Sequence, residues 1–250
     1  MSTFAGKVAL VTGGSSGIGR ATAIKFGERG AEVVVAARRE KEGNETADMI
    51  KKAGGEATFV RTDVRIASQV ENMVQQAVKK YGRLDIAFNN AGVGGIMARL
   101  VRTTEELFDE LVDTNFKGVW LSMKYEIPVM QKQGGGVIVN NASIAGVSTA
   151  ERLSVYSGSK HAVVAISNAA ATEYGKDNIR VAAICPGWIK TRMTEELRAQ
   201  KDADTTIQNT VPLKRMGEPE EVAEMVIWLA SDAASYVSGG TFIVSGGMRV

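Results

Sequence analysis

The sequence contains little of what metal centres, disulfide scaffolds and membrane spans require. It has one cysteine, Cys185, and one histidine, His161. A single cysteine excludes an intrachain disulfide, and the two residues cannot form a metal-ligand cluster, so we predict no metal. Both are interpreted as structural residues. No apolar run reaches the ~18 residues of a membrane span, and residues 1–7 lack a signal design. The default expectation is a cytoplasmic protein without a membrane partner.

Neither sign of charge is in excess. Lys and Arg number 30 and Asp and Glu number 28, which leaves a net charge of +2. A nucleic-acid surface would need clustered basic residues, so we predict no nucleic-acid partner. Apolar residues make up 44% of the 250 residues, as in ordinary globular proteins. Because no linker, repeat or low-complexity tract interrupts the chain, residues 1–250 are predicted to form one domain.

Short apolar runs alternate along the chain with amphipathic segments. Val33, Val34 and Val35 are consecutive β-branched residues, which is typical of a strand buried on both faces. Strands are expected at 8–12, 31–37, 57–60, 84–88, 137–140, 180–184 and 241–244. Helices are expected after the first strand, at 40–52, after a Ser68 cap, from a Thr104 cap to about 130, at 154–174 and at 219–230. The alternation predicts an α/β fold of the Rossmann type: a doubly wound parallel sheet of about seven strands with helices on both faces.

The first strand ends in a glycine-rich turn, and a helix-like pattern follows at once. Such a turn directs backbone N–H groups and the positive end of the helix dipole toward a phosphate. The spacing is G-x-x-x-G-x-G, at Gly13, Gly17 and Gly19, rather than the G-x-G-x-x-G of many dinucleotide sites. An ordinary glycine turn is the alternative for this motif taken alone.

Other strand ends also carry polar residues or glycines. In a parallel sheet these ends meet at one edge, where ligands bind. We expect the following strand-end residues to converge there: 12–19, 37–38, 63–64, 89–92, 141–143 and 186–187.

Tyr156 and Lys160 are four residues apart in a predicted helix and therefore share a face. A phenol has a pKa of about 10, which a neighbouring ammonium lowers. Tyr156 is then suited to exchange a proton with a carbonyl or alcohol oxygen, and Ser143 to stabilise the charge on that oxygen. The alternative is a half-buried tyrosine beside a solvated lysine.

Together these motifs resemble the short-chain dehydrogenase/reductase family over nearly the whole chain. The matching residues are Thr12-Gly13-x-x-x-Gly17-Ile18-Gly19, Asn89-Asn90-Ala91-Gly92, Asn115, Ser143, Tyr156-x-x-x-Lys160 and Pro186-Gly187. The resemblance implies that Lys160 also holds the nicotinamide ribose and that Asn115 holds a water linking Lys160 to solvent. It implies a substrate lid at 188–216 and a homotetramer. Ser245 stands where many members have an acidic residue, with an effect we do not predict.

The resemblance assigns four catalytic residues, Asn115, Ser143, Tyr156 and Lys160, and two binding sets. The cofactor set is Gly13, Ser15, Ser16, Gly17, Ile18, Gly19, Arg38, Arg39, Asp63, Val64, Asn90, Ala91, Gly92, Tyr156, Lys160, Pro186, Gly187, Ile189 and Thr191. The substrate set is Val93, Ser143, Ile144, Leu153 and Trp188. The apolar substrate wall favours a ketone or secondary alcohol without strong charge. Sugars, steroids, acyl-carrier thioesters and small ketones all fit this description, and the sequence does not select among them.

The residues after the second strand bear on the choice of cofactor. NAD-preferring relatives usually have an acidic residue where this chain has Ala37, and Arg38 follows with a charge suited to a 2′-phosphate. Ser16 argues the other way, because many NADP-preferring relatives have a basic residue in the glycine loop. We predict NADP(H) in preference to NAD(H), with NAD(H) possible. A non-catalytic nucleotide sensor, an NAD-preferring dehydrogenase and an epimerase or dehydratase of the extended relatives are the alternatives, although those relatives carry T-G-x-x-G-x-x-G.

Overall fold

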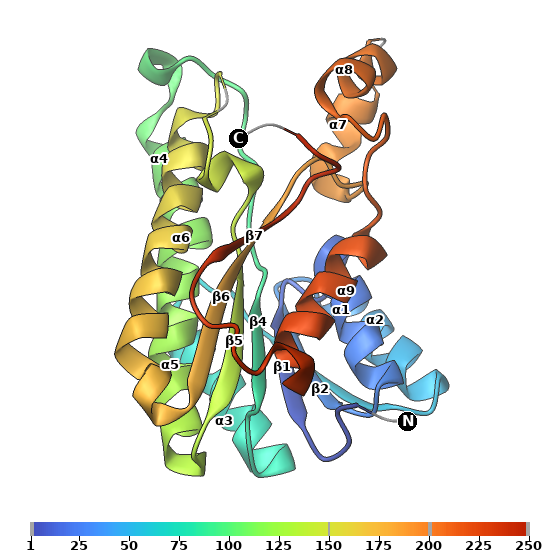
Figure 1. Cartoon of the computed structure of the whole chain (residues 1–250), viewed down its shortest axis with the longest axis vertical. Coiled ribbons are helices and arrows are strands. Elements are labelled where there is room, and N and C mark those ends of the chain that lie inside the picture. The colour runs from blue at the N-terminus through green and yellow to red at the C-terminus, as the bar shows by residue number, and fades with distance from the viewer. Residues whose placement is uncertain (1–2, 150, 200–201, 249–250) are drawn as a thin grey trace.

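The computed structural model describes residues 3–149, 151–199 and 202–248. Seven parallel strands form one sheet in the order β3-β2-β1-β4-β5-β6-β7 (Figure 1). The strands are β1 (Val8–Thr12), β2 (Glu32–Ala37), β3 (Glu56–Arg61), β4 (Ile86–Asn89), β5 (Gly136–Asn141), β6 (Ile179–Pro186) and β7 (Thr241–Val244). The predicted α/β class and the seven strands are confirmed.

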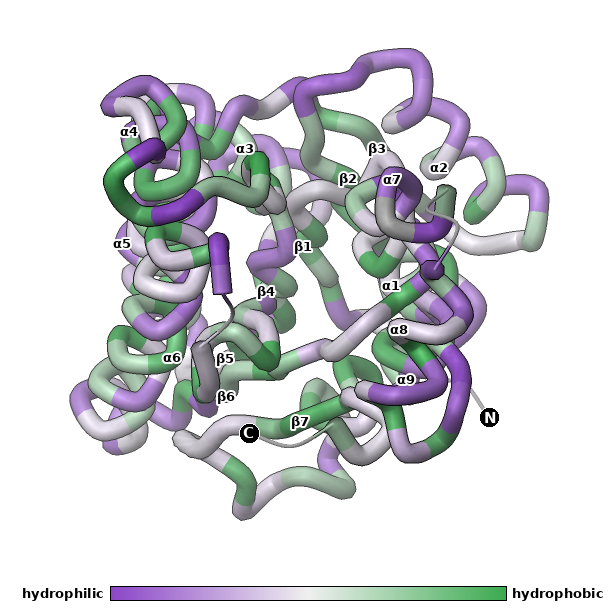
Figure 2. The backbone as a smooth tube through the Cα atoms, turned by 90° about the horizontal axis from the view of Figure 1, so that it is seen from above, coloured by the Kyte–Doolittle hydropathy of each residue, from purple (hydrophilic) through white to green (hydrophobic). Residues whose placement is uncertain are grey.

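Helices cover both faces of the sheet, as the view from above shows (Figure 2). The α-helices are α1 (Gly17–Glu28), α2 (Glu40–Lys52), α3 (Ala67–Tyr81), α4 (Glu105–Val112), α5 (Gly118–Gln133), α6 (Ser154–Tyr174), α7 (Glu195–Arg198), α8 (Ala203–Thr210) and α9 (Pro219–Ala230). Helices α3, α5 and α6 pack on one face, and α1, α2 and α9 on the other. No helix in the described ranges is long and apolar enough to cross a membrane.

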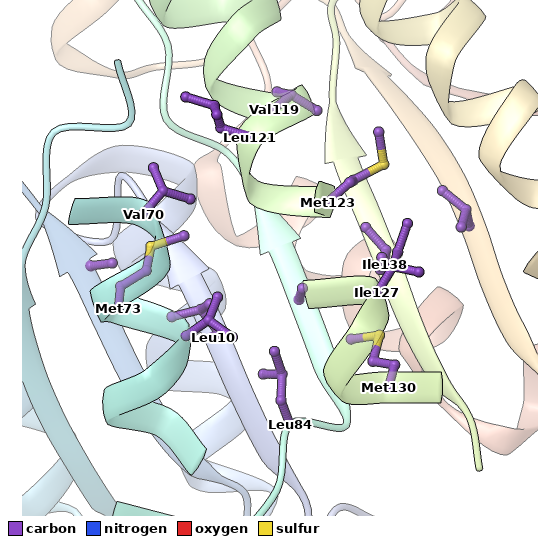
Figure 3. Packing of buried hydrophobic residues seen from close by; sticks show 14 of the residues in the cluster. Leu10, Val70, Met73, Leu84, Val119, Leu121, Met123, Ile127, Met130 and Ile138 are labelled. Atoms are coloured by element: carbon purple, nitrogen blue, oxygen red, sulfur yellow. The ribbon is translucent and has the colours of Figure 1, made fainter. Parts of the chain in front are cut away.

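Alternation along the central strands divides the core in two. Leu10 and Val34 join the cluster formed with α3, α5 and α6, whereas Ala9 and Val33 join the cluster on the opposite face. Figure 3 shows Leu10 among side chains of α3 and α5 in the first cluster. All five residues of β1 are buried, because side chains that point to opposite faces are covered on both sides.

Two helix starts test the sequence-based expectations. Thr104 caps α4, where its hydroxyl accepts from Leu107 N at 3.3 Å, as predicted. The predicted Ser68 cap is wrong, since the N-cap of α3 is Ile66. The side chain of Gln69 instead reaches back to accept from Asp63 N at 2.8 Å, so a residue inside the first turn orders this helix entry.

The strand order reverses between β1 and β4. The chain winds outward from β1 through β2 to β3, and then returns to β4 on the other side of β1. Ligands bind at such a switch point, beyond the carboxyl ends of the strands. The glycine-rich turn after β1 and the Asn90 turn after β4 therefore flank the expected site.

Candidate active site

A cleft of about 670 Å³ lies at the carboxyl edge of the sheet. The expected convergence of strand ends is present, because the turns after β1 to β6 all contribute to its walls. The predicted cofactor residues that line it are Gly13, Ser15, Ser16, Gly17, Ile18, Arg38, Arg39, Asp63, Val64, Asn90, Ala91, Gly92, Tyr156, Lys160, Pro186, Gly187, Ile189 and Thr191.

Gly19 is the predicted cofactor residue that does not line the cleft. A Cβ at Gly19 would collide with the Gly13 carbonyl and with the Asn90 amide, so this glycine permits close packing beneath the loop. Gly13 and Gly17 have φ values of +65° and +53°, which residues with a Cβ rarely adopt. Gly13 and Gly17 therefore allow the backbone conformation of the turn, and Gly19 allows the close packing beneath it.

The first turn of α1 faces the cleft without an acidic residue, and its N-cap, Ser16, makes no capping hydrogen bond. The Ser16 hydroxyl instead accepts from the Arg39 guanidinium at 2.7 Å, and Ser15 accepts from the same nitrogen at 3.1 Å. A helix N-terminus with open N–H groups and an adjacent guanidinium fits an anionic, phosphate-bearing ligand. The residues present therefore fit a dinucleotide.

Asp63 lies at the end of the cleft formed by the turn after β3. Its carboxylate accepts four hydrogen bonds from Arg65, the shortest of 2.6 Å from the guanidinium. The side-chain hydrogen bonds of Arg65 hold the pKa of Asp63 below its usual value, although partial burial opposes the shift. Arg65 thus holds the Asp63 carboxylate ionised and in one orientation at the edge of the cleft.

Tyr156 and Ser143 meet at the inner end of the cleft. Ser143 follows β5 at the start of a 3-10 turn, and Tyr156 lies in the first turn of α6. Burial raises the pKa of Tyr156, while a hydrogen bond with the Ser143 hydroxyl acts to lower it. The expected lowering of this pKa by Lys160 is wrong for the chain itself, because burial of the phenol dominates.

Lys160 lies one turn further along α6 and is only 4% exposed. Its Nζ is 5.9 Å from the centroid of the Tyr156 ring and donates to the main-chain oxygen of Asn141 at 2.9 Å. Burial lowers the pKa of Lys160 to about 8, and Cys185 opposes that shift. The ammonium is thus held near the phenol without a hydrogen bond to it among the described contacts.

Asn115 lies behind the cleft wall, in a π-helical turn (Asp113–Lys117) between α4 and α5. Its amide oxygen accepts from Val93 N at 2.8 Å, and its amide nitrogen donates to Val93 O at 3.0 Å. The same nitrogen donates to Ser159 Oγ at 3.2 Å. Asn115 therefore fixes the loop after β4 against α6.

The comparisons with known proteins agree with this geometry. A family model described as enoyl-(acyl carrier protein) reductase matches residues 13–249. An uncharacterized oxidoreductase of Thermotoga maritima is 41% identical over 251 residues, covering 98% of both chains. The chain belongs to the short-chain dehydrogenase/reductase family. A cyclohexanol dehydrogenase of an Acinetobacter species is 38% identical over 97% of this chain and 95% of that protein. The crystal structure of levodione reductase has a TM-score of 0.94 and 34% identity, covering 98% of both chains.

The substrate end of this short-chain dehydrogenase/reductase differs in part from the predicted wall. Val93 and Ser143 line the cleft, and Leu153 lines a small neighbouring cavity that also touches Tyr156. Ile144 and Trp188 line neither. Trp188 packs instead on a small cluster of three residues from the lid region: Ile207, Val211 and Met216. Trp188 therefore packs within the segment predicted as the lid and does not form the cleft wall, a placement that no local pattern indicated.

Sequence reasoning also missed lining residues in the region predicted as the lid. Met193, Thr194 and Glu196 reach the cleft. A Cβ on Gly94 would touch Met193, and a Cβ on Gly17 would touch Thr191 at 3.1 Å, so this segment lies directly over the cleft. Gly94 and Gly95 in the opposite loop could have indicated this contact from the sequence, because glycines often occur where another segment of the chain packs closely against the backbone.

The two rare residues do not form a metal centre in this short-chain dehydrogenase/reductase. The described ranges contain no group of three or more His, Cys, Asp or Glu side chains placed to hold a metal ion. Cys185 is buried, and burial raises its pKa to about 11. His161 is exposed on α6, with Nδ1 at 2.9 Å from Ser157 O.

Proposed function

We propose that the protein is an NADP(H)-dependent oxidoreductase that interconverts a ketone and a secondary alcohol. The observation that carries the proposal is the meeting of Tyr156, Ser143 and Lys160 at the inner end of the cleft. A bound nicotinamide would supply or accept the hydride. Tyr156 donates its proton to the carbonyl oxygen in reduction and accepts one in oxidation. Ser143 donates to the same oxygen and stabilises its developing charge.

Lys160 and Asn115 serve the proton-transfer group in this proposal. Lys160 holds the nicotinamide ribose, and its positive charge together with that of a bound oxidised nicotinamide would favour the phenolate of Tyr156, which burial alone disfavours in the chain without cofactor. Asn115 holds a water between Lys160 and solvent. The supporting observation is that both side chains border Gly92: a Cβ there would lie 3.1 Å from Asn115 Oδ1 and 3.4 Å from Lys160 Nζ.

The preference for NADP(H) rests on the turn after β2. Ala37 leaves no carboxylate to repel a 2′-phosphate, and the exposed Arg38 lines the cleft. Arg39 adds a second cation whose hydrogen bonds to Ser15 and Ser16 hold it against the glycine loop. Arg39 thereby brings to the loop the positive charge that Ser16 lacks, although Glu42 lies 3.7 Å from it.

The substrate is proposed to be a small carbonyl compound or alcohol without strong charge, covered by residues 188–216 as a lid. Val93 and Met193 supply apolar surface at the cleft. The similarity to a cyclohexanol dehydrogenase supports an alcohol as one of the two reactants. A homotetramer is proposed from the family resemblance. Trp228 of α9 packs against Phe242 of β7 while remaining 41% exposed, which leaves apolar surface for a second subunit.

Steady-state kinetics with NADPH and NADH test the proposal, using one good substrate chosen from a panel of carbonyl compounds. We expect a higher kcat/KM with NADPH, and a shift toward NADH in the Ala37→Asp/Arg38→Ala double variant. Equal or better use of NADH by the unmutated enzyme would favour the NAD-preferring alternative. Cofactor binding without turnover across the panel would favour the non-catalytic sensor. A monomeric mass by light scattering at micromolar concentration would contradict the tetramer.

A further inference from the structure

Asn141, the last residue of β5, lies between two parts of the candidate site. Its amide nitrogen donates to Asn90 Oδ1 at 2.9 Å, and its main-chain oxygen accepts from Lys160 Nζ at 2.9 Å. It also lines the cleft. One residue thus contacts both the turn that supports the glycine loop and the predicted catalytic lysine.

On one side, Asn141 determines which way the Asn90 amide faces. Asn90 Nδ2 donates to Thr12 O at 3.0 Å and to Gly13 O at 3.4 Å. Because Asn141 occupies Asn90 Oδ1 with a donor, the Asn90 nitrogen is left to face these carbonyls. A rotated Asn90 amide would place its oxygen against two carbonyl oxygens, and the base of the glycine loop would lose its support.

On the other side, Asn141 O is the acceptor that the described residues offer to Lys160 Nζ. The titratable groups facing this ammonium are Tyr156, whose ring centroid is 5.9 Å away, and Cys185 of β6, which acts on its pKa. The Asn115 side chain of the π-helical turn also lies near Lys160, but it is uncharged and does not titrate. The position of Lys160 therefore depends on the main chain at 141.

The Asn141 amide is not fully satisfied. Its Oδ1 is buried and has no hydrogen-bond partner in the described part of the chain. Burying an unpaired acceptor costs stability, and an apolar residue at this strand end would avoid that cost. The amide is explained if its donor is needed for the contact with Asn90.

We infer that Asn141 is a positioning residue that couples the glycine loop to Lys160. The inference rests on the proposed function, because it concerns how the same site is held ready for cofactor. It goes beyond the family motif, since Asn141 was only one of several strand-end residues and was assigned neither to the catalytic nor to the cofactor set.

The first test is the Asn141→Ala variant, titrated with NADPH by fluorescence. Losing one hydrogen bond to Asn90 should weaken NADPH binding by about five- to tenfold. The matched control is Asn140→Ala, one residue earlier on the opposite face of β5, where the amide donates to Ser167 Oγ at 2.9 Å. This control should lower Tm but keep the Kd for NADPH within about twofold per folded protein. Ser167→Ala replaces it if Asn140→Ala does not fold.

The second test is Asn141→Asp, compared with Asn141→Ala in a pH profile of kcat/KM. Aspartate keeps the shape, cannot donate to Asn90, and adds a negative charge beside Lys160. That charge raises the pKa of Lys160, so the alkaline limb should move upward by about half a pH unit or more. In Asn141→Ala the limb should stay in place. If Asn141→Ala does not fold, the NADPH titration is made on Asn141→Asp.

A merely structural role would lower Tm in Asn141→Ala and leave its Kd for NADPH at the wild-type value, which overturns the inference. An alkaline limb of Asn141→Asp that stays at the wild-type position would overturn it as well. Equal weakening of NADPH binding by Asn140→Ala would also overturn it, because the effect would then be a general loosening of β5. Failure of the wild-type protein to bind NADPH or NADH would instead refute the proposed function, and it would be seen before any variant is made.

Discussion

The two ends of the sheet treat buried ionisable groups in opposite ways. At the amino end, Asp85 precedes β4 and is almost fully buried, yet donors surround it. Its carboxylate accepts from the Arg83 guanidinium at 2.6 and 2.7 Å and from Val8 N at 2.9 Å. At the carboxyl end, Lys160 is buried to a similar degree and donates to one main-chain oxygen.

The two groups differ in whether hydrogen-bond partners or burial determine the shift of the pKa. For Asp85, burial opposes ionisation, but Arg83, Val8 N and Lys7 outweigh it and lower the pKa. For Lys160, burial prevails and lowers the pKa to about 8. Pairing at the amino end stabilises the charged form and the fold. Incomplete pairing at the carboxyl end leaves groups available to a ligand, at a cost in stability.

The largest expected effect removes the proton donor of the carboxyl end. Tyr156→Phe keeps the ring but loses the hydroxyl, and kcat should fall by about 10²–10⁴ with the fold and the cofactor Kd retained. Ser143→Ala is the matched comparison and should cost less, because it leaves the proton donor in place. Retention of more than about a tenth of wild-type kcat in purified Tyr156→Phe would refute the assignment of Tyr156.

Lys160→Met removes the incompletely paired charge itself. Both the NADPH Kd and kcat should worsen, as expected of a residue that holds ribose and favours the phenolate. Because the folded-state pKa of Lys160 is lowered, the unfolded chain binds more protons between about pH 8 and the ordinary value of 10.5. In denaturant melts, the free energy of unfolding of the wild type should therefore increase relative to that of the variant as pH rises through this window. An unchanged NADPH Kd would contradict the assigned ribose contact.

Asp85→Asn breaks the well-paired charge at the amino end. We expect a loss of about 2 kcal/mol in the free energy of unfolding at pH 7, measured in urea, with kcat per folded molecule unchanged. The lowered pKa of Asp85 stabilises the fold above the ordinary value of 3.8, and this contribution is lost as pH falls through the folded-state pKa. The difference between variant and wild type should therefore shrink in acid.

The control for Asp85 is Asp113→Asn, which breaks a 3.1 Å ion pair with Lys117 on an exposed helix surface. Screened pairs of this kind contribute about 0.5 kcal/mol or less. If the two variants cost the same, the donors around Asp85 have no special value.

A smaller effect than that of Asp85→Asn concerns Glu126 of α5, which is buried beneath the carboxyl end. Asn89 Nδ2 donates to its Oε2 at 3.0 Å, its Oε1 has no partner in the described residues, and burial raises its pKa to about 8. The folded chain then binds more protons than the unfolded chain from about pH 4.5 to 8, so stability should fall as pH rises through this range. Glu126→Gln should remove that slope and add about 1 kcal/mol at pH 9. An unchanged slope of Tm against pH would show that Glu126 is ionised when folded.

Much of the architecture follows from local pattern. The apolar runs that became β1 and β2, and the helices at 40–52 and 219–230, match the structure closely, because strand and helix periodicity are properties of neighbouring residues. The Thr104 cap is likewise a local hydrogen bond. The Ser68 cap failed because Gln69 reaches back across the helix entry, and a preference for capping residues does not include that competitor.

The site divides in the same way. The sequence alone determined the residue types and their order: the glycine turn, Ser143, Tyr156 and Lys160 on successive elements of an alternating chain. Only the tertiary structure decided that Arg39 contacts Ser16, that Trp188 packs on a separate apolar cluster and does not line the cleft, and that Asn141 joins Asn90 to Lys160. It also reversed the expected pKa shift of Tyr156. Spacing along a helix reports which side chains share a face, whereas desolvation and hydrogen-bond partners come from strands and helices that are distant in the chain.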